Sequence, residues 1–292
     1  MDSKKAELLK HEADKIMGKL FYFGSNRFED AAEKYNSAAN LFRIKKDYDR
    51  AIECMKKELE CYIKLDDKFQ IVQVYTELAN IYKNIDKEQC IQYYTKTVEY
   101  YMEMGKIDKL SKIYNEMANL YEELINLDKA AEYYKKAADL LYNDNQKMSS
   151  VKSYEKLADT FILLGKYKES IEILDNIIEN IINDQRSYFL SKYIFKLLTC
   201  HMVLHSNENT MEDFVDQLDE IVNQHITFDN TSEHNLLESL AKAYLINRND
   251  EYSRLLKDYD YYKKLDIIFV KLFSEIKNNL LNRNNFDDSD LT

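Results

Sequence analysis

His201 and His205 are the two residues whose spacing comes nearest to a metal site. They are four residues apart on one predicted helix, so they share a face where two imidazoles could bind one Zn²⁺ ion. No third ligand occurs at a suitable spacing, so we interpret them as helix-packing histidines and expect no metal and no cofactor. An enzyme that uses this pair is a third interpretation, and it predicts stoichiometric metal in the purified protein.

The other reactive side chains show no catalytic pattern. No two cysteines form a CxxC pair, and each lies on a mostly apolar side of a helical segment: Cys54, Cys61, Cys90 and Cys200. We expect buried, reduced thiols in a cytosolic protein. The chain has no glycine-rich phosphate loop and no GxSxG motif, and the pairs Asp66-Asp67 and Asp287-Asp288 fit solvated turns and tails. These patterns predict a non-enzyme.

Three lysines recur at a constant spacing that suits binding. Lys112, Lys152 and Lys192 are 40 residues apart, which would align them along one face of a helical-repeat protein. A basic stripe would suit a long acidic partner such as a helical bundle, with an association that salt weakens. The alternative is that these are scattered, solvated lysines.

The two ends of the chain carry a second kind of binding feature. Phe21, Tyr22 and Phe23 follow Lys19 and precede Arg27, an arrangement that lets aromatic rings enter a membrane interface while cations meet lipid headgroups. The alternative is a hydrophobic staple against the first hairpin. The last residues, 286–292, place apolar residues among acids and could form a short docking element or merely a solubilising tail.

The stretch 128–165 shows the element that must position these residues. It predicts two amphipathic helices joined by a polar turn, and a hairpin of this kind cannot bury its own apolar faces without neighbouring copies. Two series of small residues at a nearly constant spacing indicate that this hairpin repeats along the chain. One series lies 40, 39 and 40 residues apart (Ala39, Ala79, Ala118, Ala158), and a second lies 39, 40 and 40 residues apart (Ala51, Cys90, Ala130, Ser170).

Composition agrees with an all-helical repeat. The 292 residues include no proline and four glycines, so few residues interrupt helices. We predict an all-α, right-handed, tetratricopeptide-like solenoid of antiparallel hairpins with a period of about 40 residues, somewhat longer than the 34-residue repeat. The charged amino terminus is unlike a secretory signal, and no apolar run is long enough for a membrane span. We therefore expect a cytoplasmic protein.

The regular spacing weakens after Asp184, and the charge also changes along the chain. Residues 201–292 contain 18 acidic and 9 basic residues, whereas residues 1–200 contain 34 and 32. An acidic carboxy-terminal third suits a basic protein partner and argues against nucleic acid. We predict a helical-hairpin sheet at 1–183, a helical bundle at 184–281 and a flexible acidic tail at 282–292.

Several segments in order resemble the soluble NSF attachment proteins, closest to the alpha members of that family. After the early helix and its aromatic-glycine loop come AAEKYNSAANLFRIKKDY at 31–48, YNEMANLYEELINLDKAAEYYKKAADLL at 114–141, LLGKYKESIEIL at 163–174 and KDYDYYKKLD at 257–266. The chain then closes on an acidic ending, Asp290-Leu291-Thr292. The resemblance covers essentially the whole chain.

This resemblance implies a non-enzymatic adaptor that binds the four-helix SNARE bundle and recruits and stimulates the hexameric ATPase NSF. It implies a cytoplasmic protein that is peripheral on membranes. By position, the residues that face the SNARE bundle would be Lys83, Lys106, Lys112, Lys152, Tyr188 and Lys192. Phe21, Tyr22 and Phe23 would enter the membrane, and the residues that meet NSF would be Asp287, Asp288, Asp290 and Leu291.

The chain also departs from the family pattern. Its aromatic loop is shorter, and Asn84 occupies the position of a second consecutive lysine. These differences leave open a weaker membrane contact and a less basic SNARE surface. The alternative function is a general helical-repeat scaffold that binds peptide tails in its concave groove.

Overall fold

The computed structural model describes residues 2–19, 26–183 and 190–289, with side chains for residues 3–283 within those ranges. Its secondary structure in these ranges is helical, which confirms the all-α, tetratricopeptide-like fold class. The chain divides into two compact units, unit 1 at residues 1–120 and unit 2 at residues 121–292. The predicted boundaries at 183/184 and 281/282 stay predictions; α14 continues past the second of these, to Ser289.

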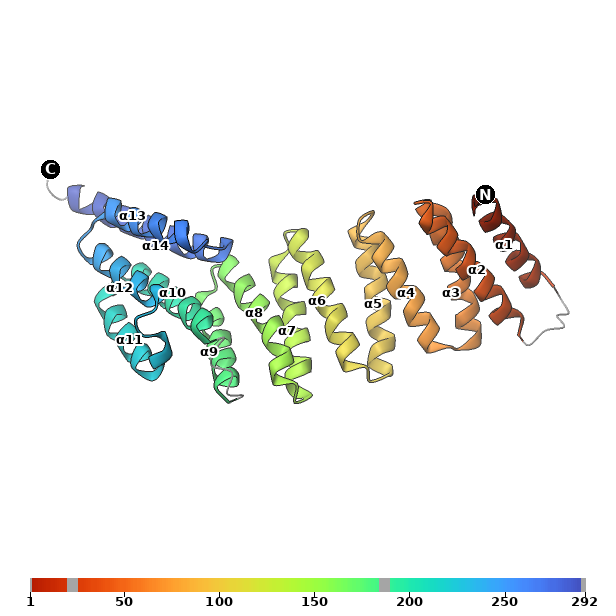
Figure 1. The fold of residues 1–292 in the computed structure, drawn as a ribbon, viewed down its shortest axis with the longest axis horizontal. Helices are drawn as coiled ribbons and strands as arrows, with labels where there is room; N and C mark the ends of the chain where they lie inside the picture. The colour runs from red at the N-terminus through yellow and green to blue at the C-terminus, as the bar shows by residue number, and fades with distance from the viewer. Residues whose placement is uncertain (1, 20–25, 184–189, 290–292) are drawn as a thin grey trace. The chain divides into compact units, whose positions relative to one another are not determined.

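Unit 1 is a row of helices (Figure 1). Its helices are α1 (Asp2–Met17), α2 (Arg27–Ile44), α3 (Tyr48–Leu65), α4 (Lys68–Tyr82), α5 (Lys87–Glu103) and α6 (Ile107–Glu123), whose last residues belong to unit 2. Successive helices from α1 to α5 pack on one another. Aspartates at the predicted turns cap the helices that follow: Asp47, Asp67 and Asp86 each accept a hydrogen bond from a backbone N–H of the first turn.

Unit 2 begins as a row of helices and then changes its pairing. Its helices are α7 (Leu127–Asn143), α8 (Lys147–Leu163), α9 (Tyr167–Asn183), α10 (Leu190–Glu208), α11 (Met211–Gln224), the short 3₁₀ helix η2 (Ile226–Phe228), α12 (Ser232–Leu245), α13 (Asn249–Tyr262) and α14 (Ile267–Ser289). The buried helix α10 contacts α9, α11, α12 and α14, and α14 also reaches α8. Elements distant in sequence therefore meet around α10.

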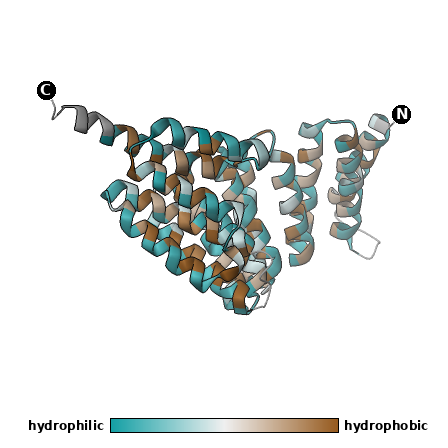
Figure 2. Ribbon diagram, turned by 60° about the vertical axis from the view of Figure 1, so that its left-hand side comes forward, coloured by the Kyte–Doolittle hydropathy of each residue, from teal (hydrophilic) through white to brown (hydrophobic). Residues whose placement is uncertain are grey.

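The repeated small residues form the contacts between helices, as the spacing predicts. All eight are buried: Ala39, Ala51, Ala79, Cys90, Ala118, Ala130, Ala158 and Ser170. A small side chain at these positions lets neighbouring helices approach closely. Figure 2 shows that hydrophobic and hydrophilic residues alternate along the helices, as expected for amphipathic helices. Among the described residues, no helix is long and apolar enough to cross a membrane.

Candidate partner-binding surface

In unit 1, one glutamate pairs with one of the predicted lysines and lies one helical turn from another. Lys83 at the end of α4 donates to Glu116 Oε2 on α6 at 2.6 Å. Lys112 is exposed on α6, one helical turn before Glu116, and makes no ion pair within the described residues. The surface at this point is therefore two cations around one carboxylate, less basic than the lysines alone suggest.

The same ion pair occurs one repeat earlier. Arg43 on α2 contacts Glu77 on α4 at 2.9 Å, just as Lys83 on α4 contacts Glu116 on α6. In each pair the base lies four residues after an alanine of the first repeated series, and the acid lies two residues before the next alanine of that series. Sequence reasoning missed these acids, although their constant offset from the alanines was a usable signal.

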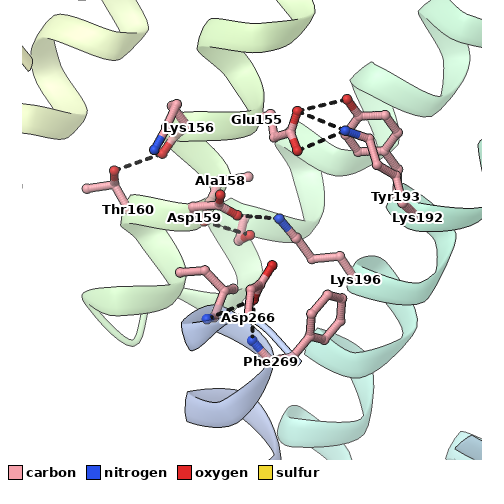
Figure 3. Close-up of polar contacts among 12 residues, drawn as sticks. Glu155, Lys156, Ala158, Asp159, Thr160, Lys192, Tyr193, Lys196, Asp266 and Phe269 are labelled. Atoms are coloured by element: carbon pink, nitrogen blue, oxygen red, sulfur yellow. Dashed lines mark hydrogen bonds and ion pairs between the residues drawn. The ribbon is translucent and has the colours of Figure 1, made fainter. Parts of the chain in front are cut away.

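Unit 2 carries a second cationic face, which we call the α8–α10 face and define by Lys152, Lys156 and Lys192. All three are exposed, and neither Lys152 nor Lys156 makes an ion pair in the described structure. Lys192 Nζ contacts both oxygens of Glu155, at 3.0 and 3.2 Å, and lies 4.4 Å from the centre of the Tyr193 ring (Figure 3). Lys192 is thus partly neutralised before any partner binds.

Glu155 holds this arrangement in place. It also accepts a hydrogen bond from the Tyr193 hydroxyl at 3.0 Å. Burial alone would raise the pKa of Glu155, but the hydrogen bond and charge of Lys192, helped by Tyr193, lower it. Glu155 therefore stays ionised and competes with any acidic partner for Lys192.

Next to this face lies a buried ion pair between α8 and α10. Lys196 Nζ contacts Asp159 Oδ1 at 2.5 Å, and the Lys196 side chain is only 7% exposed. Burial raises the pKa of Asp159, although the charge of Lys196 opposes the shift. Asp266 lies beside this pair and caps α14 by accepting hydrogen bonds from the backbone N–H groups of Ile268 and Phe269 (Figure 3). One polar cluster therefore joins α8, α10 and α14.

The remaining predicted site residues are placed less completely. Lys106 is exposed in the turn before α6. The backbone of α14 includes Asp287 and Asp288, whose side chains lie outside the described structure. Also outside the described residues are Phe21, Tyr22, Phe23, Tyr188, Asp290 and Leu291. Lys112 belongs to unit 1 and Lys152 to unit 2, so their alignment along one stripe stays a prediction.

The histidine pair has a structural explanation. His205 Nδ1 lies 2.7 Å from Thr210 Oγ1, and its Nε2 lies 3.2 Å from Gln217 Oε1, so both ring nitrogens are engaged between α10 and α11. Burial, and then the charge of His205, lower the pKa of His201 to about 4. No group of three or more metal-binding side chains occurs among the described residues. The predicted burial of all four cysteines is confirmed.

Stacked helix hairpins with charged, exposed faces and a polar cluster that joins helices define a helical-repeat protein suited to docking other proteins. A family model agrees with this class and makes it specific. The model described as "Soluble NSF attachment protein, SNAP" matches residues 4–281. The chain belongs to the soluble NSF attachment protein family, a family named for an attachment role.

Individual relatives agree over most of the chain. The vesicular-fusion protein SEC17 of Komagataella phaffii is 27% identical, and the alignment covers 98% of this chain and 99% of that protein. The beta-soluble NSF attachment protein of Bos taurus is 26% identical over 88% of this chain and 85% of its own. Among solved structures, the Signal Transduction ATPase with Numerous Domains (STAND) protein with a tetratricopeptide repeat sensor from Pyrococcus horikoshii has a similar fold, with a TM-score of 0.53 and 16% sequence identity. The match covers 94% of this chain and 44% of that chain.

Proposed function

We propose that this protein is a non-enzymatic adaptor that binds assembled SNARE complexes and recruits and stimulates the NSF ATPase to disassemble them, in vesicle fusion and intracellular transport. The observation that carries the proposal is the family match over residues 4–281. The protein would act in the cytoplasm and at membrane surfaces, through protein partners and without nucleic acid. Purified SNARE complex, NSF, ATP and the folded protein should release SNARE monomers, and no release would refute the proposal.

The exposed lysines support a role in gripping the acidic SNARE bundle. Lys112 on α6 and Lys152 on α8 have no ion pair within the described residues, so neither must leave a partner to meet an acid. Lys83 and Lys192 would each have to leave an ion pair, with Glu116 and Glu155 respectively, before they bind an acid of the SNARE bundle. Breaking these pairs costs little, because exposed ion pairs contribute only about 0 to 1 kcal/mol to stability. Lys106 and Tyr188 would add further contacts with the bundle.

The combined substitution Lys112→Glu and Lys152→Glu should weaken binding to the SNARE complex by at least about tenfold at low salt, because two attractions become repulsions. Binding is measured by titration of labelled SNARE complex. The substitutions Lys64→Glu and Lys168→Glu serve as a matched control, since both residues are exposed on first helices of hairpins, α3 and α9. Equal losses in the two double variants would show that net charge, not position, matters.

The chain ends would supply the other two contacts. Phe21, Tyr22 and Phe23 would insert into the membrane, and Asp287, Asp288, Asp290 and Leu291 would meet basic surfaces of NSF. Leu291→Ala should reduce stimulation of the ATPase severalfold while SNARE binding stays unchanged, because one apolar anchor is lost from an otherwise charged contact. ATP hydrolysis measured with prebound complex tests this expectation. Unchanged stimulation would leave the tail with no role beyond solubility.

One observation favours the alternative of a peptide-binding scaffold. In unit 1, a groove of about 650 Å³ lies along α2 and α4, lined by Asn40, Arg43, Ile44, Tyr48, Asn80, Ile81, Asn84 and Ile85. Amides beside apolar side chains can bind an extended peptide. A scaffold of this kind would bind short linear motifs and would be indifferent to Leu291, so the ATPase experiment also separates the two functions.

A further inference from the structure

The corner between α13 and α14 exposes more large apolar surface than any other short segment of the described chain. We define the α13–α14 corner by Tyr261, Tyr262, Ile267 and Val270, which are 78%, 82%, 75% and 49% exposed. The two tyrosine rings contact each other edge to face, with centroids 5.1 Å apart. Single exposed apolar residues are ordinary, but four within ten residues indicate an interaction site.

Polar contacts brace the backbone of this corner. Asp260 accepts hydrogen bonds from the Leu265 backbone N–H at 2.9 Å and from Lys264 Nζ at 3.2 Å. Lys263 Nζ reaches across to Ser232 and Glu233 at the start of α12, both at 2.8 Å. Asp266 then caps α14. Because the backbone is already fixed, a partner that packs on the tyrosines would meet a small entropic cost.

The corner lies close to the α8–α10 face. Phe269, which follows the corner's Ile267 on α14, stacks on Phe195 of α10 with ring centroids 4.5 Å apart. Phe195 is next to Lys196 in sequence and one helical turn after Lys192. Figure 3 shows Asp266 and Phe269 beside the Asp159–Lys196 pair, in the same view as Lys156 and Lys192. The apolar corner and the cationic face are therefore neighbours within unit 2.

The charges at the corner decide between a lipid and a protein partner. Lys263 pairs with Glu233 and Lys264 pairs with Asp260, while Asp266 adds a further negative charge, so the corner itself carries no net attraction to anionic lipid. Protein interfaces, by contrast, concentrate their binding energy in a few tyrosine, tryptophan and arginine side chains. Beside a face of exposed lysines, this neutral tyrosine pair suits an apolar contact with the same acidic partner.

We propose that Tyr261 and Tyr262 form an apolar hot spot that packs against the acidic SNARE bundle beside the lysines of the α8–α10 face. This inference rests on the proposed function and adds to it a contact that salt does not screen. The lysines would steer the bundle into place, and the tyrosine pair would slow its dissociation.

The test measures the affinity of the full-length protein for assembled SNARE complex at about 50 mM and about 500 mM salt. Combined Tyr261→Ser and Tyr262→Ser substitutions should weaken binding by about tenfold at both salt concentrations. The Lys112→Glu and Lys152→Glu variant should bind more weakly than the wild type at low salt, and this difference in affinity should disappear at high salt. Combined Tyr261→Phe and Tyr262→Phe substitutions should retain the wild-type affinity, because the rings and not the hydroxyls make the contact.

Ile246→Ser is the matched control, because Ile246 is 59% exposed at the far end of α12 from Ser232 and should not affect binding. Unchanged affinity of the serine variant would overturn the inference. The inference would also be overturned if the serine variant lost only its binding to phosphatidylserine vesicles or only its recruitment of NSF. Either result would assign the corner to another partner. Failure of the wild-type protein to bind would instead refute the proposed function.

Discussion

At the scale of single residues, the availability of each lysine for a partner depends on the acidic side chains that lie beside it. Lys112 and Lys152 face solvent, whereas Lys192 shares Glu155 with Tyr193 and Lys196 is buried against Asp159. Four lysines on similar helices therefore have different roles. Of these four, Lys112 and Lys152 can attract a partner without losing an ion pair within the described residues.

Glu58 on α3 is a buried carboxyl whose shifted pKa makes stability depend on pH. It is 2% exposed, accepts a hydrogen bond from Asn36 Nδ2 at 2.9 Å, and burial raises its pKa from 4.5 to about 7. The folded state therefore favours the protonated carboxyl. Its contribution to stability is complete below pH 4.5, the unfolded pKa, and is lost as the pH rises through about 7.

Glu58→Gln should remove this pH dependence. We expect a small change in the free energy of unfolding at acidic pH and a gain of up to about 3 kcal/mol at alkaline pH, because the wild-type protein alone must bury a charge. Urea unfolding at both pH values measures the difference. Glu60→Gln changes an exposed neighbour and should have no such effect. A gain at Glu58 that is independent of pH would contradict the prediction.

At the scale of elements, many of the turns that join successive helices contain a residue in the left-handed conformation. Gly105 and Gly165 have φ of +61° and +73°, and Asn145 has φ of +59° in an equivalent turn. Ile125, 20 residues after Gly105, adopts φ of +58° although it is β-branched and 86% exposed. The turn pattern imposes this conformation, since isoleucine strongly disfavours it.

Ile125→Gly should therefore stabilise the protein by about 1 kcal/mol, and Ile125→Asn should give a similar gain. Gly165→Ala should cost about the same amount, because a Cβ at Gly165 meets no atom within 4 Å and only the backbone conformation resists it. Denaturant unfolding of the variants provides the measurement. If both Ile125 variants lose stability, the exposed isoleucine makes a contact that outweighs its strain.

At the scale of the whole molecule, the two units are organised differently. Unit 1 packs successive helices from α1 to α5 on one another, whereas unit 2 gathers α9, α11, α12 and α14 around α10. Long-range contacts fix α14 there: Phe273 packs near Phe195, and Asn279 donates to Ser206 Oγ at 2.9 Å. The helix that leads to the acidic tail is therefore attached to the helix that carries Lys192.

Lys196→Met should lower the stability of unit 2 by about 3 to 5 kcal/mol, because Asp159 would remain buried without its partner. Adding Asp159→Leu should recover most of the loss, since an apolar pair replaces the ions. Hydrogen exchange should show reduced protection in α8, α10 and α14 and little change in α1–α4. A double variant as unstable as the single one would contradict this role of the pair.

The sequence by itself determined the helices, the repeat, the turns and the family, because these depend on residues that are close in the chain or that recur at a fixed period. The 40-residue spacing predicted the buried small residues correctly, and the aspartates marked the helix starts. The same spacing placed Lys112 and Lys152 on exposed positions of equivalent helices. For these features local propensity and periodicity suffice.

Only the tertiary structure decided which of the predicted lysines are paired and where apolar surface stays exposed. Glu116 meets Lys83 across 33 residues, and Glu155 meets Lys192 across 37. The sequence shows the constant offset of Glu77 and Glu116 from the repeated alanines, but the offset alone does not tell which exposed acid lies within reach of each lysine. The exposure of Tyr261 and Tyr262 likewise depends on how α13, α14 and α12 meet, since an aromatic run in sequence resembles a core segment until packing leaves it uncovered.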